Sequence, residues 1–557
     1  MLLPVLYSSD RIDRARPGFE CGRIRNRTAI LNDTTLATSA AGRDARGRII
    51  RALLVAACAV AGVLGAAGPA HAAGRLDTAL TDGGPFNFDP ENAFPRVYDA
   101  GARFVRVYAK WSEIAPAGTE NETGRFDRPE GFEARNPADP LYDWAQLDRQ
   151  VTAAAAAGLA PIVVFSSAPR WAELVKSDFR PGTNKPNPSD FGDFGYAAAT
   201  RYSGAFGGLA RVTYWQAWNE PNLFSFLQPQ YDTPIRDDVT LDSKPLAPSV
   251  YRPMLNAFAD AVRSVHEDNY VIAAGLAPFG RFEKFDHAVP PLQFMRHLLC
   301  LSDRLRPIDG CEQGVSFDAW ATHPYTQGSP ARSAQFPDNV SIGDLPDMRR
   351  VLRAAIRAGH IRSDRKVEFW VTEISWDTKP PDPGGVPLKL HARWVSEALY
   401  RMWKSRVTLV TWFQLRDGYA PDLPKSREYT SGLYFRCAEG LHCDKPKPAL
   451  RAFRFPFVAY TKKRRIRFWG RTPAGVEGTV VIQQRRGGRW RDVRERETNP
   501  NGLFKGKVRT RRRGKMRAKG AGDRSQSFSL KVPREITVNP FGGCEGAKAE
   551  NPVCPGS

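Results

Sequence analysis

Short apolar runs alternate with amphipathic, alanine-rich segments from residue 76 to about residue 460. The runs are rich in β-branched and aromatic residues, which favour strands, and the segments between them repeat apolar positions at helical spacing. The pattern predicts strands at residues 77–82, 104–108, 161–166, 212–218, 271–275, 317–322, 367–373 and 408–413. It predicts helices at residues 93–100, 143–157, 191–206, 250–266, 292–305, 347–358 and 388–404.

Eight strands alternating with helices over nearly 400 residues predict an α/β fold, a (β/α)8 TIM barrel over residues 73–458. Residues 161–165 are apolar on both faces of the strand, as a sheet covered by helices requires. A doubly wound sheet is the main alternative. The chain has no G-x-G-x-x-G after the first strand and no Walker loop, which favours the barrel.

Helical periodicity ends after residue 456, and short alternating strands follow. They are expected at residues 465–469, 479–483, 490–494, 503–508, 515–518 and 528–532, and Gly487-Gly488 has the composition of a hairpin turn. We expect a small, basic, all-β sandwich domain of immunoglobulin-like type at residues 459–540. A cysteine-containing tail completes the chain at residues 541–557.

The leader, residues 1–72, has the features of a signal peptide. An uncharged run at residues 52–68 follows a basic segment that ends at Arg51, and a small-x-small site ends at Ala72. We expect cleavage after Ala72, a secreted protein, and no stable membrane span after cleavage. An uncleaved membrane anchor through residues 52–68 is the alternative. Because signals normally begin near the first residue, we expect the true start to lie nearer Arg48.

Six cysteines follow the expected cleavage site and form three pairs that are close in sequence. An even number in an exported chain favours disulfides over zinc. The economical pairing joins Cys300 to Cys311, Cys437 to Cys443, and Cys544 to Cys554. Fifteen connectivities exist in principle, and free buried thiols are the alternative.

The formal net charge of +22 is unevenly distributed. Lys and Arg exceed Asp and Glu by 6 up to Arg75 and by 18 in residues 461–540, whereas residues 76–460 carry a net −1. The charge therefore says little about the substrate of the barrel and raises the question of an acidic partner for the small domain. No nucleic-acid-binding module accompanies it, so no nucleic acid is expected. A solvated arginine-rich face and a surface for an anionic cell-wall polymer remain as alternatives.

Two carboxylates stand at the ends of predicted barrel strands, where barrel enzymes carry their active sites. The fourth strand ends in Asn219-Glu220, and the seventh ends in Glu373. Carboxylates on these strands face each other across the barrel mouth, which suits glycoside hydrolysis by a general acid and a nucleophile or base. Taken alone, Asn219-Glu220 also reads as a helix N-cap with an acid in the first turn, and Glu373 as a salt-bridge partner.

This pairing resembles that of the clan A glycoside hydrolases, retaining TIM-barrel glycosidases such as families 5 and 39, over most of residues 76–460. The resemblance implies that Glu220 is the acid/base, that Glu373 is the nucleophile and that Asn219 holds the sugar 2-hydroxyl. It implies double-displacement cleavage of O-glycosidic bonds, expected to be β, in an oligo- or polysaccharide. The carbohydrate is the expected substrate partner.

Further positions match the same clan. Arg106, in Phe-Val-Arg-Val-Tyr, corresponds to an arginine that steadies the nucleophile, with an ordinary barrel salt bridge as the alternative. In His323-Pro-Tyr325 the tyrosine corresponds to one that hydrogen-bonds the nucleophile, and a buried, satisfied histidine is the alternative for His323. Trp412 ends the eighth strand, where clan members place a tryptophan as the floor for the sugar.

Trp171 and Trp376 are further candidates for sugar contacts, with core packing as the alternative. No metal and no cofactor is expected, since the mechanism needs none and no H-E-x-x-H spacing occurs. A different class of function also remains: a non-catalytic cell-surface protein that binds carbohydrate through the barrel and an anionic wall polymer through the basic domain.

Overall fold

A computed structural model describes residues 74–309, 314–418 and 429–538. All of them belong to one of the two units into which the chain divides, Pro69–Ser557. Within these residues no helix is both long enough and apolar enough to cross a membrane. The expected signal segment at 52–68 and the tail with Cys544 and Cys554 lie outside the described residues.

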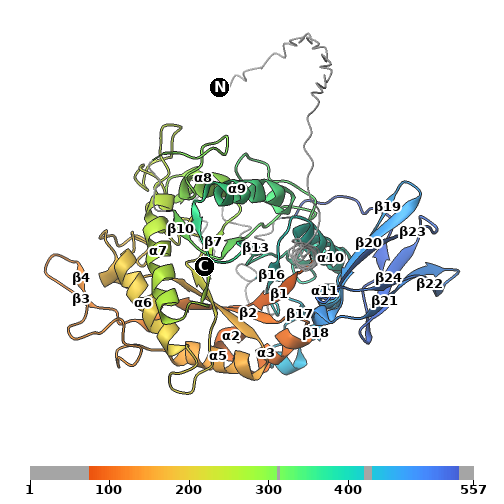
Figure 1. The fold of residues 1–557 in the computed structure, drawn as a ribbon, viewed down its shortest axis with the longest axis horizontal. Coiled ribbons are helices and arrows are strands. Elements are labelled where there is room, and N and C mark those ends of the chain that lie inside the picture. Colours follow the sequence, from red (N-terminus) through yellow and green to blue (C-terminus); the bar gives the residue numbers. More distant parts are fainter. Residues whose placement is uncertain (1–73, 310–313, 419–428, 539–557) are drawn as a thin grey trace, which may run out of the picture. The chain divides into compact units, whose positions relative to one another are not determined.

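A closed barrel of eight parallel strands forms the centre of this unit (Figure 1). The strands are β1 (Asp77–Thr81), β2 (Phe104–Lys110), β5 (Ala160–Ser166), β6 (Tyr214–Ala217), β7 (Tyr270–Leu276), β11 (Ala319–Thr322), β13 (Glu368–Val371) and β16 (Leu409–Phe413). β1 closes the ring because it pairs with both β2 and β16. The predicted TIM barrel is thus confirmed, and each of the eight predicted strands is present.

Helices surround the barrel (Figure 1). They are α3 (Pro90–Asp99), α5 (Ala145–Ala156), α6 (Pro188–Arg201), α7 (Ala247–Val265), α8 (Pro291–Leu298), α9 (Leu345–Ala358) and α10 (Leu388–Lys404). Each occupies a predicted position. α8 ends well before the predicted residue 305, because the chain turns at Cys300 with a left-handed φ of 56°. α9 ends where its pattern predicts, at Ala358, and Gly359 follows as a C-cap with a φ of 74° that suits glycine.

Short elements occupy the connections of the barrel. They are α2 (Pro85–Phe88), α4 (Trp111–Ile114), β3 (Thr119–Glu120), β4 (Phe126–Asp127), η2 (Arg170–Ala172), β8 (Arg281–Glu283), β9 (Asp286–Ala288), β10 (Val315–Ser316), η3 (Ile342–Asp344), β12 (Ile361–Arg362), β14 (Thr378–Lys379), β15 (Val386–Pro387), β17 (Tyr434–Phe435), η4 (Leu441–Cys443), β18 (Lys445–Pro446) and α11 (Pro448–Arg454).

The barrel interior is a packed core whose members identify the inward face of each strand. Fully buried side chains meet there from several strands: Ala79, Ile162, Ile272, Ala319, Ala321, Trp370 and Leu409. Since side chains of a strand alternate between its two faces, Arg106 and Tyr108 point inward with Phe104 on β2. Gln216 points inward with Tyr214 on β6 by the same rule. Polar groups therefore lie inside the barrel above its apolar core.

Two antiparallel sheets follow the barrel, as the sequence predicts for a small sandwich. One holds β19 (Phe457–Lys462), β20 (Arg465–Arg471) and β23 (Leu503–Val508); the other holds β21 (Thr479–Arg486), β22 (Arg489–Glu497), β24 (Lys515–Gly520), β25 (Asp523–Arg524) and β26 (Phe528–Ser529), with η5 (Pro473–Gly475) between β20 and β21. Their alternate apolar side chains are buried, among them Ile466, Phe468, Val480, Ile482, Met516 and Ala518. The first strand, β19, is an addition to those predicted.

The first of these sheets packs against helix α10 of the barrel. The rings of Trp403 and Trp469 lie 5.4 Å apart, and that of Tyr400 lies 5.5 Å from Trp469. Arg393 of the same helix donates a hydrogen bond of 2.7 Å to the carbonyl of Ser529. Aromatic packing and a charge-assisted hydrogen bond thus join the sheets to the barrel wall.

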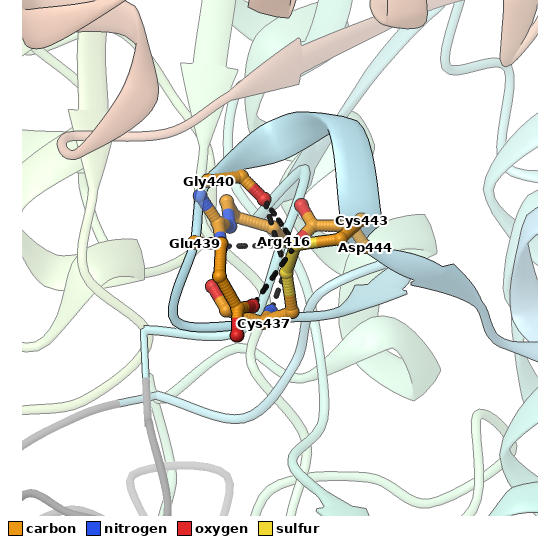
Figure 2. The surroundings of a disulfide bond; sticks show 6 residues. All are labelled: Arg416, Cys437, Glu439, Gly440, Cys443 and Asp444. Atoms are coloured by element: carbon orange, nitrogen blue, oxygen red, sulfur yellow. Dashed lines mark hydrogen bonds and ion pairs between the residues drawn. A yellow bond between two sulfur atoms is a disulfide. The ribbon is translucent and has the colours of Figure 1, made fainter.

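A disulfide joins Cys437 to Cys443, as predicted, in the segment between β17 and β18 (Figure 2). Asp444 accepts the backbone N–H of Cys437 at 2.9 Å and pairs with Arg416 at 2.8 Å, which ties this loop to the chain beyond β16. Glu439 lies beside both sulfur atoms, but sulfurs joined in a disulfide are not the thiolates that bind metals. Cys300 is also disulfide-bonded, and its predicted partner Cys311 lies outside the described residues.

Candidate active site

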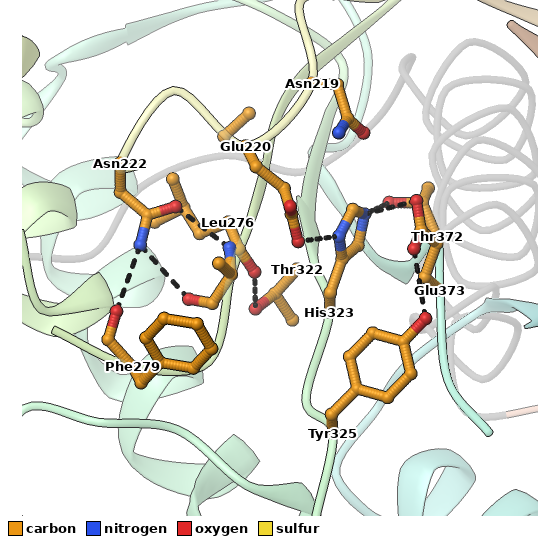
Figure 3. Close-up of polar contacts among 12 residues, drawn as sticks. Asn219, Glu220, Asn222, Leu276, Phe279, Thr322, His323, Tyr325, Thr372 and Glu373 are labelled. Atoms are coloured by element: carbon orange, nitrogen blue, oxygen red, sulfur yellow. Dashed lines mark hydrogen bonds and ion pairs between the residues drawn. The ribbon is translucent and has the colours of Figure 1, made fainter. Parts of the chain in front are cut away.

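Glu220 and Glu373 lie at the carboxyl ends of β6 and β13, on the same side of the barrel (Figure 3). The side chain of Glu220 is 14% exposed and that of Glu373 is 10% exposed, so both are largely desolvated and still reachable. His323, which follows β11, lies between them. Its Nδ1 is 2.7 Å from Glu220 Oε1, and its Nε2 is 3.7 Å from Glu373 Oε1.

The backbone at Glu220 is held in an unusual conformation. Trp218 has a φ of 72° and Glu220 a φ of 39°, values that side chains other than glycine rarely adopt. Such strain persists only where surrounding contacts enforce it, and it concentrates at functional sites. Asn222 supplies one such contact: it is fully buried, accepts the N–H of Ala277 and donates to the carbonyl of Val289.

The helix N-cap interpretation of Asn219-Glu220 is wrong. A turn follows, closed by the Leu223 N–H on the carbonyl of Glu220, and the next helix, α7, begins at Ala247. The side chain of Asn219 points elsewhere: its Oδ1 accepts a hydrogen bond of 2.8 Å from Arg106 Nη2. Asn219 and Glu220 therefore contact other residues at the barrel mouth and do not cap a helix.

Three donors hold the carboxylate of Glu373. Arg106 Nη1 donates to Oε1 at 2.8 Å, the hydroxyl of Tyr108 donates to the same oxygen, and the hydroxyl of Tyr325 donates to Oε2 at 3.0 Å. Burial alone would raise the pKa of Glu373. The electrostatic interactions with His323 and Arg106 and the hydrogen bonds from the two tyrosine hydroxyls outweigh burial, and the pKa of Glu373 falls below its usual value. Glu373 is therefore ionised at neutral pH.

Glu220 has the opposite electrostatic environment. Burial raises its pKa above the ordinary value, and the negative charge of Glu373 adds to this effect. The hydrogen bond with His323 offsets only part of the increase. His323 Nε2 lies 3.0 Å from the hydroxyl of Thr372, which fixes the ring between the two carboxyl groups. The two acids thus have pKa values shifted in opposite directions, a pattern that assigns one as acid and the other as base or nucleophile.

Arg106 connects the strands beneath the site. It is fully buried, and its Nε donates to Gln216 Oε1 at 2.9 Å while its two Nη atoms reach Glu373 and Asn219. The ordinary-salt-bridge alternative for Arg106 accounts for only one of these contacts. Its planar group instead sets the distance between the ends of β6 and β13.

The sequence analysis did not assign a role to Tyr108, Gln216 or Thr372, although all three contact the site. Strand alternation is the signal that points to Tyr108, because it lies two positions after Arg106 on β2. Gln216 and Thr372 share the inward face in the same way, but their partners are on other strands. Tyr429 is a further neighbour, since the charges of Glu373 and Glu220 contribute to raising its pKa beyond the effect of burial.

Trp412 does not face the barrel mouth, which corrects the expectation that it forms the sugar floor. On β16 the inward residue is Leu409, so Thr411 and Phe413 share its face, whereas Trp412 points outward. There it is 1% exposed and packs against His391 of α10, with ring centroids 5.6 Å apart. Phe413 occupies the position expected of Trp412: it lies at the end of β16 on the inward face, is partly exposed and packs on Tyr429.

The other two tryptophans differ in accessibility. Trp376 is completely buried, donates its indole N–H to the carbonyl of Thr326 at 2.8 Å and packs on Trp394, so the core-packing alternative holds for it. Trp171 lies in η2, in the loop after β5, and is partly exposed. Its indole N–H donates to the carbonyl of Pro116 at 2.7 Å, which fixes the ring at the mouth side of the barrel. Trp171 keeps an accessible surface for a ligand.

Comparisons with known proteins find similar folds at low identity. No protein-family model matches the chain, and no curated protein matches it. Among solved structures, a family 39 glycoside hydrolase from Bacteroides cellulosilyticus WH2 is 17% identical with a TM-score of 0.46, over 79% of this chain and 82% of that one. A glucosidase from Croceicoccus marinus is 14% identical with a TM-score of 0.41, over 74% and 77%. A β-glycosidase from Thermosphaera aggregans is 15% identical with a TM-score of 0.41, over 66% and 84%.

At these identities and TM-scores the matches carry no conclusion about activity, so the chemistry rests on the site itself. The site presents one carboxylate whose pKa is lowered beside a carboxyl group whose pKa is raised, both at one end of the barrel. Within the described residues, the group of side chains with metal-ligand spacing is Cys437, Glu439 and Cys443, at the disulfide and not among the acids of the mouth. The oxygens of Glu373 are engaged by Arg106 and the two tyrosines.

Proposed function

We propose that this protein is an exported, retaining glycoside hydrolase that cleaves β-O-glycosidic bonds of an oligo- or polysaccharide. One observation carries the proposal: Glu220 and Glu373 meet at the barrel mouth with pKa values shifted in opposite directions. Acid-assisted displacement at an anomeric carbon requires one carboxyl group that donates a proton and one ionised carboxylate that attacks.

In the first step Glu373 attacks the anomeric carbon, and the bond from that carbon to the leaving oxygen breaks. Glu220 transfers its proton to the leaving oxygen, so an alcohol departs and a glycosyl ester of Glu373 remains. Arg106, Tyr108 and Tyr325 orient the attacking carboxylate. Glu220 is ionised after this step and is stabilised by its contact with His323.

In the second step Glu220 takes a proton from water, whose oxygen attacks the anomeric carbon. The ester bond to Glu373 breaks, which returns the free carboxylate and a protonated Glu220. Two inversions give net retention. The Oδ1 of Asn219 is occupied by Arg106, which leaves its amide N–H groups as donors toward the sugar 2-hydroxyl.

The proposal is tested by incubating the wild-type protein with a panel of nitrophenyl α- and β-glycosides and β-linked polysaccharides. We expect release of nitrophenol from at least one β-glycoside, and proton NMR is expected to show the β-anomer as the first product. Release of the α-anomer first would contradict the double displacement. Hydrolysis that persists undiminished in both Glu220→Ala and Glu373→Ala would contradict the site.

Export is part of the proposal and rests on the apolar segment at residues 52–68 and on the disulfide chemistry. The Cys437–Cys443 disulfide supports it, because disulfides persist mainly in oxidising compartments. The alternative is retention on the membrane through residues 52–68. N-terminal sequencing of the protein from the culture medium is expected to begin at Ala73, and recovery only in the membrane fraction would favour the anchor.

The activity is expected to show a bell-shaped pH profile. Activity falls at low pH as Glu373 becomes protonated, and it falls at high pH as Glu220 loses its proton. Tyr325→Phe removes a donor that favours ionised Glu373, so the pKa of Glu373 rises and the acidic limb moves to higher pH. We also expect Tyr325→Phe to lower kcat/KM by about tenfold, which corresponds to the free energy of one hydrogen bond to a charged group.

The matched control for this variant is Tyr142→Phe, which also removes a buried hydroxyl, here bonded to the carbonyl of Ala134 at 2.6 Å. It is expected to leave both limbs in place. The measurement is kcat/KM as a function of pH for the three proteins. An acidic limb that moves equally in both variants would show that the shift has no connection with Glu373.

We expect that Gly275, on β7, cannot be replaced by a residue with a side chain, because Gln216 and His323 of the site lie against it. It has a φ of 83°, and a Cβ built on it would lie 2.5 Å from Gln216 Nε2 and 3.1 Å from His323 Nε2. Gly275→Ala should lower both the unfolding midpoint and kcat/KM. Gly359→Ala is the control, since Gly359 has a φ of 74° in open space and tests backbone strain alone. Equal loss of activity in both variants would refute the contact explanation.

A further inference from the structure

Most of the excess positive charge of the C-terminal sheets is exposed, and the structure shows how it is arranged. One group, which we call the basic patch, lies on the β19–β20 turn, on the exposed side of β20 and β23, and on the loop after β23. Figure 1 shows these strands side by side. The members of the basic patch are all exposed: Lys462, Lys463, Arg464, Arg465, Arg467, Lys507, Arg509, Arg511, Arg512 and Arg513. Arg512 donates to the carbonyl of Lys463 at 2.9 Å, which joins the loop to the turn.

The strand register places like charges directly opposite each other in this patch. Lys462 pairs with Arg465 across β19 and β20, and Arg467 pairs with Lys507 across β20 and β23. Directly opposed like charges destabilise a sheet. None of the patch cations forms an ion pair with an acid in the part of the chain that the structure describes. Folding therefore gains nothing from this arrangement.

The other sheet also contains a basic strand, β22, and its charges are arranged differently. β22 carries arginines too, but Asp492, Glu495 and Glu497 alternate with them along the same strand. Asp492 accepts a hydrogen bond of 2.7 Å from Gln483, and Arg517 stacks over Trp490 at 4.2 Å. Like charges also face each other in that sheet, where Arg486 lies opposite Arg489. The difference is in the acids, which alternate with the cations on β22 and are absent from β19, β20 and β23.

An open cleft of about 560 Å³ adjoins the basic patch and is lined by Thr461 and by three members of the patch, Arg511, Arg512 and Arg513. The arginine side chain ends in a planar, fork-shaped set of donors that matches the geometry of carboxylate and phosphate. We propose that the basic patch binds a linear acidic polysaccharide, whose carboxylate or phosphate groups lie in this cleft and along the faces of β20 and β23.

The composition of the surface favours a polysaccharide over a nucleic acid or a membrane. Single-stranded nucleic acids are held on exposed aromatic rings on which bases stack, and no aromatic residue belongs to the basic patch. Insertion into a bilayer needs exposed apolar side chains; among described residues 457–538 the large exposed ones are Val476 and Val532, and neither belongs to the patch. A charged glycan needs only cations spaced along a face, which is what the strands present.

The experiment measures binding of the full-length protein to immobilised polygalacturonate and to a phosphodiester-linked glycan, with dextran as the neutral polymer, between 50 and 200 mM salt. We expect binding to one or both acidic polymers and none to dextran, weakening as salt rises. Arg511→Gln/Arg512→Gln/Arg513→Gln should weaken binding at least about tenfold and reduce the slope of log K against log salt by up to about three.

The matched control, Arg491→Gln/Arg494→Gln, removes exposed arginines of β22 and is expected to bind as the wild type does. Hydrolysis of a small nitrophenyl glycoside should be unchanged in both multiple variants, so failure of the patch and failure of the proposed activity are distinguishable. Equal weakening in the control would overturn the assignment to the patch. Absence of salt-dependent binding to either acidic polymer, or binding only to duplex DNA or phosphatidylglycerol vesicles, would overturn the proposal.

Discussion

Glu373→Gln is expected to reduce kcat for every substrate by about 10⁴-fold or more, because the reaction then lacks its nucleophile. Glutamine fills the same volume and keeps an oxygen for Arg106 and Tyr108, which share Oε1, and only Tyr325 loses its acceptor, so the fold is retained. The control is Glu368→Gln at the opposite end of the same strand, where Glu368 accepts from Trp370 Nε1 and from the hydroxyl of Thr408. That variant should keep most of its activity.

Glu220→Ala should have a different kinetic signature from Glu373→Gln. An aryl glycoside with a good leaving group needs little protonation, so the glycosyl ester still forms. Its hydrolysis lacks a base and becomes slow, with a loss of about 10²- to 10⁴-fold. Added azide needs no base and should restore turnover, with a glycosyl azide as product. Restoration by azide in Glu373→Gln, or none in Glu220→Ala, would contradict the assignment of the two roles.

Arg106→Met is expected to lower the free energy of unfolding by about 3–5 kcal/mol, because it leaves a buried carboxylate without its charged partner. Arg106 is fully buried and donates to Glu373, Gln216, Asn219 and the hydroxyl of Tyr108, so four groups lose a donor together. The ion pair with Arg106 helps to lower the pKa of Glu373 in the folded protein. Its contribution to the free energy of unfolding is therefore complete above the ordinary pKa of glutamate, and it is lost as the pH falls through the lowered pKa of folded Glu373.

Urea unfolding of three further variants tests this explanation. Arg103→Met removes a half-buried arginine that stacks on Tyr98 at 4.0 Å, and it should cost about 1 kcal/mol or less. Arg106→Met combined with Glu373→Gln leaves no unpaired buried charge and should be more stable than Arg106→Met alone. A double variant as unstable as Arg106→Met would show that packing, not the ion pair, accounts for the loss.

The sequence predicts the barrel and its two acids because both depend on local signals. Strand and helix periodicity is read within each segment, and Glu220 and Glu373 stand at strand ends that the alternation defines. Trp412 shows the limit of this reasoning. The sequence places Trp412 correctly at the end of β16, but its orientation depends on which residues of that strand point into the barrel. Leu409 points inward in the closed barrel, so Trp412 points outward, and the sequence alone does not show this.

Contacts between distant strands are the part that sequence reasoning does not reach. Gln216 and Thr372 hold Arg106 and His323 from strands far away in the chain, and no local pattern pairs them. The basic patch has the same origin: composition shows an excess of cations, but only the register of β20 against β23 brings Arg467 opposite Lys507. Such pairings depend on closure of the sheets.

The central claim is that Glu373 forms a covalent bond to the sugar while Glu220 serves as acid and then base. Mass spectrometry of Glu220→Ala, quenched during turnover of an aryl β-glycoside that the wild type cleaves, tests it most directly. The account predicts a mass increase of one glycosyl residue, located by peptide mapping on Glu373. An adduct on another residue, or steady release of the aryl group with no adduct on Glu373, would contradict it.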